Sequence, residues 1–431
     1  MPIGLPRVLG DLWRHSPMIL GAACTILVPR GQAETYYVSA ETGADDAAGK
    51  TPDTAFHSFA PALALLKPGD RLVIASGLYK EPMRVSVSGT AEAPIEIQGA
   101  AGARPMVRAE EDAISIDADY IVLSHLDAVG ATGSAIVIQP KHHHVTVADN
   151  LVHDSGTAGI VGIQTDYLSI LRNRAFGNAM TSIWQGSGIS IYQAANFDTK
   201  PGFHNVIAQN IAYGNYNKVP DPKLPPATLG HTTDGNGIII DDFRHTQVWM
   251  GKTTPPYTAE SLVENNLVFD NGGRGIQVFL SDNVTVRNNT SVRNLQDPKL
   301  LGTKFGEIQA VYAKNIKMFN NIMVPRNDHF YGVMAADAKA LEADYNLTVG
   351  GSATYFFRSS GIAWGAHNTV GHEPGFRAPD AEGDRADFHL TARSEALGRG
   401  DPRQAPAVDL DGHARRGDGP ADVGAYQFAP G

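Results

Sequence analysis

A recurring asparagine constrains the fold of this chain more than any other feature. Short segments of alternating apolar and polar residues each end in an asparagine, at positions 150, 173, 210, 266, 289, 321 and 346. A second series of short apolar segments lies between them, including AIVIQ, GISIYQ, GIIIDD and GIQVFL. A repeat unit this small cannot bury its own apolar face, so successive units must stack on one another.

Stacking of these units would bring the asparagines into a ladder, in which side-chain amides bond to one another and to the backbone. The pattern therefore predicts an all-β fold, a single-stranded right-handed parallel β-helix with three short strands in each coil. The intervals between successive asparagines are uneven, and those from Asn173 to Asn210 and from Asn210 to Asn266 are the longest. This irregularity disfavours a β-propeller, whose blades repeat at a regular period.

The first 33 residues differ from the rest of the chain. Arg7 and Arg14 precede the apolar run PMILGAACTILV, and the small-residue sequence GQA precedes Glu34. This pattern is typical of a secretory signal peptide, so we predict that the protein is secreted or periplasmic. The only cysteine, Cys24, lies inside this segment. The mature chain would therefore have neither a disulfide nor a thiolate nucleophile.

The charge of the chain limits its partners. The formal net charge is −10 and becomes more negative without residues 1–33, because that segment holds three arginines and one aspartate. An acidic chain of this kind is unsuited to nucleic acid. No segment after residue 33 is long and apolar enough to span a bilayer. We expect a monomer that binds no nucleic acid and has no membrane span.

Both ends of the predicted coil resemble segments of secreted bacterial β-helix proteins of the pectate lyase-like superfamily. Residues 36–82 are similar to the N-terminal cap of such proteins, and FAPALALL within them would form a capping helix. Residues 409–428, DLDGHARRGDGPADVGAYQF, resemble the segment that covers the last coil. The resemblance implies one β-helix domain over residues 34–428, with an N-terminal cap at 34–82 and a closing segment at 385–428.

The segment GIIIDDF, residues 237–243, places apolar residues and paired carboxylates together. Alternation along a strand predicts that Ile238 and Ile240 point into the core. Ile239 and Asp241 would then point outward. Ile238 and Ile240 require burial, while the carboxylate requires a polar environment. Opposite faces of one strand meet these two requirements.

The same outward positions on neighbouring coils predict a groove. Asp242 falls at the end of the strand and enters the next turn. Tyr192 lies on the preceding coil, and Gln277 and Phe279 lie on the following one. We therefore predict a shallow polar and aromatic groove on this face.

Two long insertions, residues 217–234 and 244–260, enter and leave the strand that carries Asp241. Loops of this length in a compact domain are commonly functional. Arginine and lysine suit uronic acid carboxylates, and tryptophan and tyrosine suit sugar faces. We expect the insertions to wall the groove with His231, Asp234, Arg244, His245, Trp249, Lys252 and Tyr257.

Polymer-binding grooves on β-helices belong, by resemblance, to polysaccharide lyases, glycoside hydrolases and uronate C5-epimerases. The chain partly resembles polysaccharide lyase family 9, whose calcium site comes from aspartates in DG-type coils and whose base is a lysine on the next strand. The resemblance implies a Ca²⁺ ion held by Asp234, Asp241 and Asp242. The position of that lysine holds Gln277 here, so a lyase would need another base. The candidates are Lys252, His231, Arg244 and Tyr192.

We predict a secreted carbohydrate-active enzyme, a polysaccharide lyase that cleaves an acidic, uronic acid-containing polysaccharide by β-elimination. Arg274 could neutralise the substrate carboxylate. The catalytic candidates are Asp241, Asp242, Arg244, Lys252, His231 and Arg274, and the substrate-binding candidates are Tyr192, Gln277, Phe279, Trp249 and Tyr257.

Three alternatives stay open from the sequence. The carboxylates of Asp234, Asp241 and Asp242 would equally supply the acid and base of a glycoside hydrolase, and an epimerase could use the same scaffold. A non-catalytic polysaccharide-binding or surface protein, in which Asp241 and Asp242 hold a structural calcium ion, is the alternative of a different class.

Overall fold

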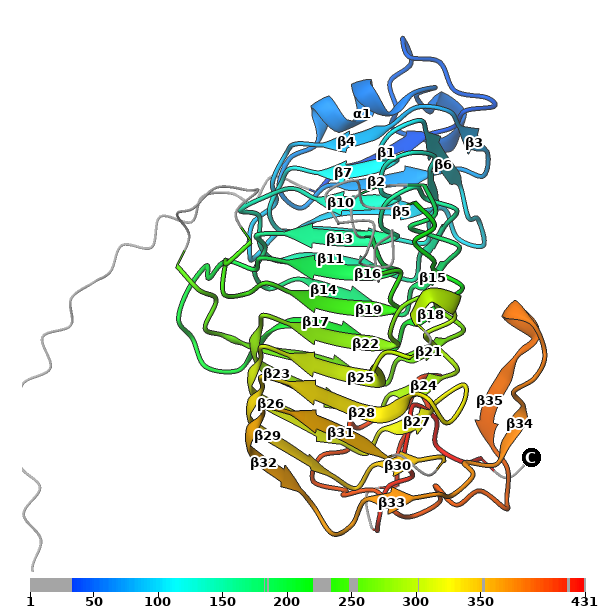
Figure 1. Cartoon of the computed structure of the whole chain (residues 1–431). Helices are drawn as coiled ribbons and strands as arrows, with labels where there is room; N and C mark the ends of the chain where they lie inside the picture. Colours follow the sequence, from blue (N-terminus) through cyan, green and yellow to red (C-terminus); the bar gives the residue numbers. More distant parts are fainter. Residues whose placement is uncertain are drawn as a thin grey trace, which may run out of the picture. The chain divides into compact units, whose positions relative to one another are not determined.

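Three long parallel sheets form the framework of the unit 34–431, in the part of it that the structure describes (Figure 1). From β2 onward, each coil of the chain passes from sheet 1 through sheet 2 to sheet 3. Residues 1–32, which hold nearly all of the predicted signal peptide, lie outside the described residues. The computed structural model describes residues 33–181, 183, 186–219, 234–247, 255–300, 302–350, 353–416 and 419–429.

The strands of each sheet pair in chain order. Sheet 1 has the order β1 (Thr35–Val38), β2 (Arg71–Ile74), β5 (Ile95–Gly99), β8 (Ile121–Ser124), β11 (Val145–Ala148), β14 (Ser169–Leu171), β17 (Phe203–Ala208), β20 (Glu260–Glu264), β23 (Asp282–Arg287), β26 (Lys314–Phe319), β29 (Lys339–Asp344) and β32 (Ser360–Trp364). Sheet 2 has the order β3 (Leu78–Tyr79), β6 (Met106–Ala109), β9 (Asp127–Gly130), β12 (Leu151–His153), β15 (Arg174–Phe176), β18 (Ile211–Tyr213), β21 (Leu267–Phe269), β24 (Thr290–Val292), β27 (Ile322–Val324), β30 (Leu347–Thr348) and β33 (Thr369–Val370). Sheet 3 has the order β4 (Met83–Val85), β7 (Ile114–Ile116), β10 (Ile136–Ile138), β13 (Ile160–Ile163), β16 (Ile189–Tyr192), β19 (Ile238–Asp241), β22 (Ile276–Phe279), β25 (Gly306–Val311), β28 (Tyr331–Ala336) and β31 (Thr354–Phe357).

Few described elements lie outside these sheets. They are helix α1 (Phe59–Leu65), the antiparallel hairpin of β34 (Phe376–Ala378) and β35 (Asp387–Leu390), and the short 3₁₀ turns Pro52–Thr54, Pro298–Leu300 and Gly383–Arg385. Among the described residues, no helix is long and apolar enough to cross a membrane. The architecture is the right-handed parallel β-helix that the asparagine pattern predicts.

Stacked aliphatic side chains fill the space between the three sheets. Ile160, Ile189, Ile238, Ile276 and Ile308 are partners in register on successive strands of sheet 3, and none of them is exposed to solvent. Burial of one such side chain contributes about 1.5–3 kcal/mol. A slip of one residue would turn the whole column outward, so burial also fixes the register.

The predicted asparagine ladder is confirmed. Each amide Nδ2 donates to the Oδ1 of the asparagine on the next coil, at 2.9–3.1 Å, through Asn150, Asn173, Asn210, Asn266, Asn289, Asn321, Asn346 and Asn368. The same Nδ2 also donates to a backbone carbonyl, as Asn266 does to Ile207. The ladder satisfies the buried polar groups of the turn between sheets 1 and 2.

A second ladder, which the sequence did not reveal, lies at the turn between sheets 2 and 3. It runs through Asn178, Asn215, Asn271 and Asn294, with Nδ2 to Oδ1 distances of 2.7–3.0 Å. It ends at Glu307, whose carboxylate accepts bonds from the backbone N–H and the Nδ2 of Asn294. A buried carboxyl group therefore terminates this row of amides.

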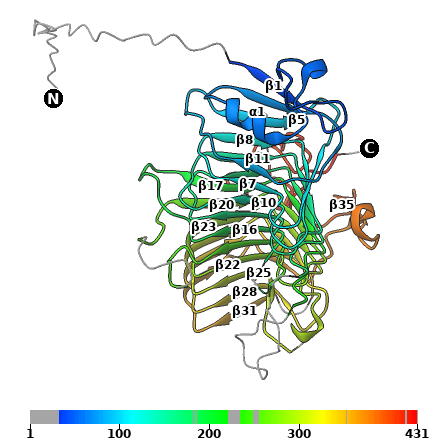
Figure 2. The same ribbon diagram turned by 90° about the horizontal axis from the view of Figure 1, so that it is seen from above.

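Helix α1 covers the N-terminal end of the coil (Figure 2). Its buried residues are Phe59, Ala62 and Leu63, and the ring of Phe59 stacks on Tyr79 with 4.8 Å between the ring centroids. The helix contacts β1 and β4. Its apolar face thus covers the first strands, which have no preceding coil to pack against.

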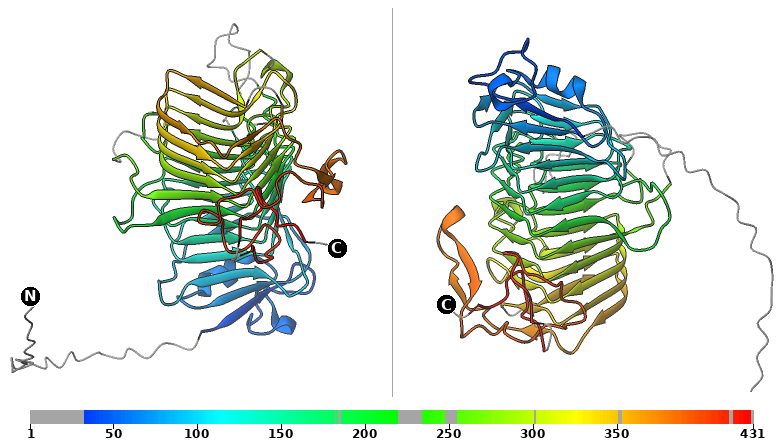
Figure 3. Two further views of the ribbon diagram at one scale, coloured as in Figure 1. Left: turned by 90° about the horizontal axis from the view of Figure 1, so that it is seen from below. Right: turned by 180° about the vertical axis from the view of Figure 1, so that it is seen from behind.

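The closing segment lies elsewhere than the resemblance implies, because it follows the outer face of sheet 2 (Figure 3). Leu267 and Phe269 of β21 are buried there against Phe388 of β35 and against Tyr426. Asn320, at the end of β26, donates to the carbonyl oxygen of Asp401 at 3.0 Å. The physical reason is that several outward side chains of sheet 2 are apolar and require a cover.

A candidate active-site groove on sheet 3

A cavity of about 1160 Å³ lies on the outer face of sheet 3, over β10 to β28. With about 4.8 Å between neighbouring strands, it extends for roughly 30 Å along the sheet. The outward residues of these strands form its floor. One row in register holds Val161, Ser190, Ile239, Gln277 and Gln309, and the next row holds Ile163, Tyr192, Asp241, Phe279 and Val311.

The faces of the strand GIIID follow the predicted alternation. Ile238 and Ile240 are buried in the core. Ile239 and Asp241 line the cavity. Asp241 is partly buried, and the Nε2 of Gln247 donates to its Oδ1 at 3.1 Å. The strand therefore places its carboxyl group between aromatic neighbours, on a floor of mixed polar and apolar side chains.

Two charged residues that precede strands of the floor lie beside Asp241 in the cavity lining. Asp234 comes shortly before β19, and Arg274 comes shortly before β22. The Nη1 of Arg274 lies 4.0 Å from the Oδ1 of Asp234. The guanidinium group of Arg274 also lies over the ring of Phe305, at 3.9 Å from its centroid. Arg274 is thereby held at the edge of the groove next to Asp234.

The environment changes the protonation of these groups. Burial raises the pKa of Asp241 well above its ordinary value, and the charges of Asp234 and Asp242 raise it further. Burial also raises the pKa of Asp234 to about 6, although the charge of Arg274 opposes this shift. Burial lowers the pKa of Arg274 to about 10, against the effect of Asp234. These shifts favour the protonated form of Asp241, while Asp234, with its pKa of about 6, is largely ionised at pH 7.

Asp242 does not share the groove with its neighbour, in contrast to our prediction of a catalytic and metal-binding role. Its side chain is fully buried and accepts four hydrogen bonds, from the N–H and Oγ1 of Thr246, the N–H of Gln247 and the Nε2 of Gln193, at 2.7–2.8 Å. Its φ angle of 50° turns the chain out of the strand. Asp242 fixes the turn that holds Gln247 beside Asp241.

Two other predicted site residues lie outside the groove. Arg244 forms an ion pair with Asp282, with its Nη2 at 2.5 Å from Oδ1, and does not line the cavity. Tyr257 is buried in the core, where its hydroxyl donates to Asp166 at 2.7 Å and its ring packs on Phe243. Contacts with partners on other coils determine where Arg244 and Tyr257 lie. The local sequence does not reveal these partners. The predicted residues His231, Trp249 and Lys252 lie outside the described residues.

The described residues do not fit the calcium site that the resemblance implies. The carboxylates of Asp234, Asp241 and Asp242 do not meet in one set of ligand atoms. The oxygens of Asp242 are occupied by backbone and side-chain donors. A cationic guanidinium already lies beside Asp234. A divalent cation would have to displace these partners.

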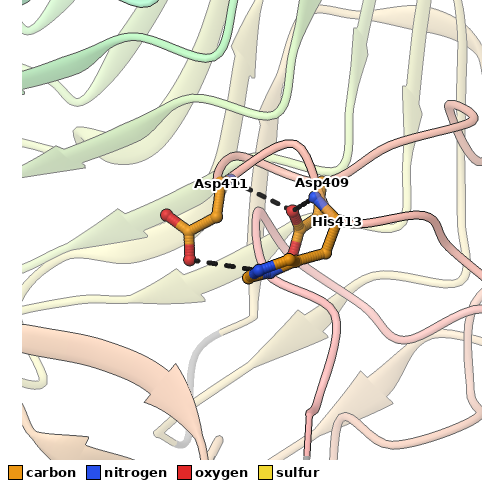
Figure 4. Close-up of side chains that lie close together, drawn as sticks. All are labelled: Asp409, Asp411 and His413. Carbon is orange, nitrogen blue, oxygen red and sulfur yellow. Dashed lines mark hydrogen bonds and ion pairs between the residues drawn. The ribbon is translucent and has the colours of Figure 1, made fainter.

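Among the described residues, one cluster has the spacing of metal ligands, and it lies in the closing segment (Figure 4). Asp409, Asp411 and His413 place one ligand atom each within 4.8 Å of the others. The Asp409 carboxylate accepts backbone N–H groups of Asp411, His413 and Gln427, at 2.8–3.0 Å. Asp411 contacts His389 at 2.7 Å. These hydrogen bonds close a tight turn, and the turn accounts for the proximity of the three side chains.

Sequence reasoning did not identify several residues of the groove. Glu111 and Asp112 line it from the turn before β7, and Gln139 lines it from the end of β10. These residues belong to no recognisable motif. Gln309, by contrast, follows from the repeat itself, because IQAV aligns with IQVF of the preceding coil and the two strands pair in register.

Comparisons with known proteins agree with this architecture. No protein-family model and no curated protein matches the sequence. Among solved structures, one described as a glycoside hydrolase is similar with a TM-score of 0.56 and 8% sequence identity, over 78% of this chain and 96% of that one. Pectate lyase Pel9A is similar with a TM-score of 0.50 and 14% identity, over 93% of this chain and 97% of that one. The likeness shows the fold, so the chain is a right-handed parallel β-helix protein.

Proposed function

We propose that this protein is a carbohydrate-active enzyme that cleaves glycosidic bonds in the sheet 3 groove, with Asp241 as the general acid. The observation that supports this most is the pair Asp241 and Asp234, two carboxyl groups with raised pKa values in one long groove. Titratable groups shifted by burial and by one another are typical of active sites. The two solved structures of this fold named above are described as a glycoside hydrolase and a pectate lyase.

The two carboxyl groups suit hydrolysis. Asp241, whose protonated form is favoured by burial, donates its proton to the glycosidic oxygen as the C–O bond breaks. Asp234, ionised above about pH 6, takes a proton from the water that attacks the sugar carbon. Arg274 lowers the pKa of Asp234 and so keeps this base ionised at neutral pH. The overall reaction adds one water across one glycosidic bond.

The floor beside Asp241 suits sugar rings. Tyr192 and Phe279 are its partners in register on the two neighbouring strands, so an aromatic ring lies on each side of the acid. Aromatic side chains bind the C–H faces of sugars, and the open length of the groove accommodates a polymer. We also propose that the protein meets its polymer outside the cytoplasm, consistent with the signal-peptide pattern of residues 1–33.

Elimination from a uronic acid polymer is the second candidate reaction. Arg274 favours elimination, because this arginine is the one basic side chain that lines the described part of the groove. Its guanidinium group could neutralise a substrate carboxylate. Elimination needs a base near the proton next to that carboxylate, and Asp234 would be the nearest ionised group. This candidate differs from hydrolysis in its product, which carries an unsaturated sugar end.

One assay tests both reactions. The purified protein is incubated with a panel of neutral and uronic acid polysaccharides, and new reducing ends and ultraviolet absorbance are recorded together. Hydrolysis predicts reducing ends without absorbance, while elimination predicts both. Absence of any product across the panel would contradict the proposed function. Asp380→Asn, at a side chain that is 97% exposed, is a suitable control variant.

A further inference from the structure

Two glutamines on the floor of the groove differ from the asparagines of the ladders. Gln277 on β22 and Gln309 on β25 are partners in register and line the cavity. They are only 5% and 1% exposed. The Oε1 of each side chain has no hydrogen-bond partner among the described residues. In the asparagine ladders, by contrast, the same stacking of coils satisfies every amide oxygen from Asn173 to Asn346.

Buried acceptors without donors are costly, so these two oxygens indicate a ligand that supplies donors. A carbonyl oxygen accepts from O–H or N–H groups. A sugar hydroxyl is such a donor, whereas an ionised carboxylate can only accept. The two oxygens therefore favour hydroxyl groups over carboxylates as their own partners.

The charges of the groove lead to the same conclusion. Among the described residues, the acidic side chains that line it are Glu111, Asp112 and Asp234, besides Asp241, the proposed acid that holds its proton. The basic side chain of the described lining is Arg274, which lies beside one of these acids at 4.0 Å. A surface with this balance repels a polymer that carries a carboxylate on each sugar.

The neighbours of the two glutamines suit the apolar face of a ring. Phe279 and Val311 lie two residues further along the same strands and also line the cavity, and Met334 follows Gln309 on β28. The floor thus combines two hydrogen-bond acceptors with aromatic and aliphatic surface. Such a combination is typical of sites that bind one face of a sugar ring by contact and its edge by hydrogen bonds.

We infer that the floor over β22 and β25 is a subsite for a neutral sugar ring, whose hydroxyl groups donate to the Oε1 atoms of Gln277 and Gln309. The subsite adjoins β19 and therefore lies next to Asp241. This inference rests on the proposed function and names its substrate class. It replaces the acidic polysaccharide that the family resemblance implies.

Binding to the full chain carrying Asp241→Asn, in which turnover should be strongly reduced, tests the inference. Calorimetry measures the affinity for neutral tetrasaccharides of glucose, xylose, mannose or galactose, and for tetrasaccharides of galacturonate and mannuronate. We expect at least one neutral probe to bind about tenfold more tightly than either uronate probe. Adding Gln277→Ala or Gln309→Ala should weaken that binding by about tenfold each, the scale of losing one buried hydrogen bond.

Gln98→Ala is the matched control, because Gln98 lies on β5 of sheet 1 and does not line the cavity. It should leave the affinity unchanged. Tighter binding of the uronate probes would contradict the inference while leaving the proposed function intact. Unchanged affinity for the neutral probe in both glutamine variants would contradict the position of the subsite. Binding of none of the probes would contradict the proposed function together with the inference.

Discussion

Asp241 and Asp242 are adjacent in the sequence, but their carboxyl groups lie in different environments. Asp241 faces the groove and receives one hydrogen bond, from Gln247. Asp242 is buried in the following turn and receives four, one of them from the backbone N–H of the same Gln247. The buried carboxylate therefore positions the side chain that contacts the proposed acid.

Asp242→Asn should destabilise the protein. An asparagine offers one acceptor oxygen where the aspartate uses two, so at least one buried donor is left unmatched. The expected loss is about 1–3 kcal/mol in the free energy of unfolding, measured by denaturant titration. Turnover should fall less than in an Asp241 variant, because the affected contact is indirect. Unchanged stability would show that the turn does not depend on this carboxylate; Asp380→Asn provides the comparison.

The rate should depend on pH as a bell-shaped curve. The base Asp234, with its pKa of about 6, must be ionised, so activity should rise as the pH increases through about 6. The acid Asp241 must hold its proton, so activity should fall again at higher pH. Arg274→Gln removes the charge that lowers the pKa of Asp234, and the rising limb should move to higher pH. A rising limb that stays in place in this variant would contradict the assignment of Asp234 as the base.

Glu307 should make stability depend on pH. Burial raises its pKa from 4.5 to about 7 in the folded protein. Between these two values the folded state binds more protons than the unfolded state, so the free energy of unfolding should fall as the pH rises from about 4.5 through 7. Glu307→Gln cannot titrate and should show a smaller decrease of Tm between pH 5 and pH 8. Equal slopes for the two proteins would exclude this group as the source.

A break in the asparagine ladder should be costly. Asn266 donates to Ile207 and Asn289 and accepts two bonds from Asn210. Asn266→Ala leaves these buried groups unmatched, and each costs about 1–3 kcal/mol, so we expect a loss of at least about 3 kcal/mol. Asn327→Ala, at a partly exposed turn where the side chain accepts one bond from His329, should cost much less. Similar losses in the two variants would show that the ladder is not a main source of stability.

The fold and the faces of its strands could be predicted from the sequence because both follow from local periodicity. The asparagines mark equivalent turns, and alternation places Ile238 inward and Asp241 outward. The closing segment could not be placed in this way. Its position depends on apolar side chains on the outer face of sheet 2, such as Phe269. In the sequence, such outward apolar residues cannot be told from residues of the core.

The side chains of the insertions were harder to predict than those of the strands. Arg244 and Tyr257 are held by Asp282 and Asp166, partners that lie on other coils. Nothing in the local sequence identifies such partners. Adjacency to Asp241 suggests that Asp242 also faces the groove, but its positive φ angle turns it into the buried turn.

The central claim is that Asp241 is the acid of an active site in the sheet 3 groove. The most direct measurement is the initial rate of bond cleavage by Asp241→Asn and by the unmodified chain, on a polysaccharide that the unmodified chain cleaves. We predict a decrease of at least ~100-fold, the scale of losing a general acid, with an unchanged Tm because the side chain points away from the core. A folded variant that cleaves at the unmodified rate would contradict the account and place the active site outside this groove.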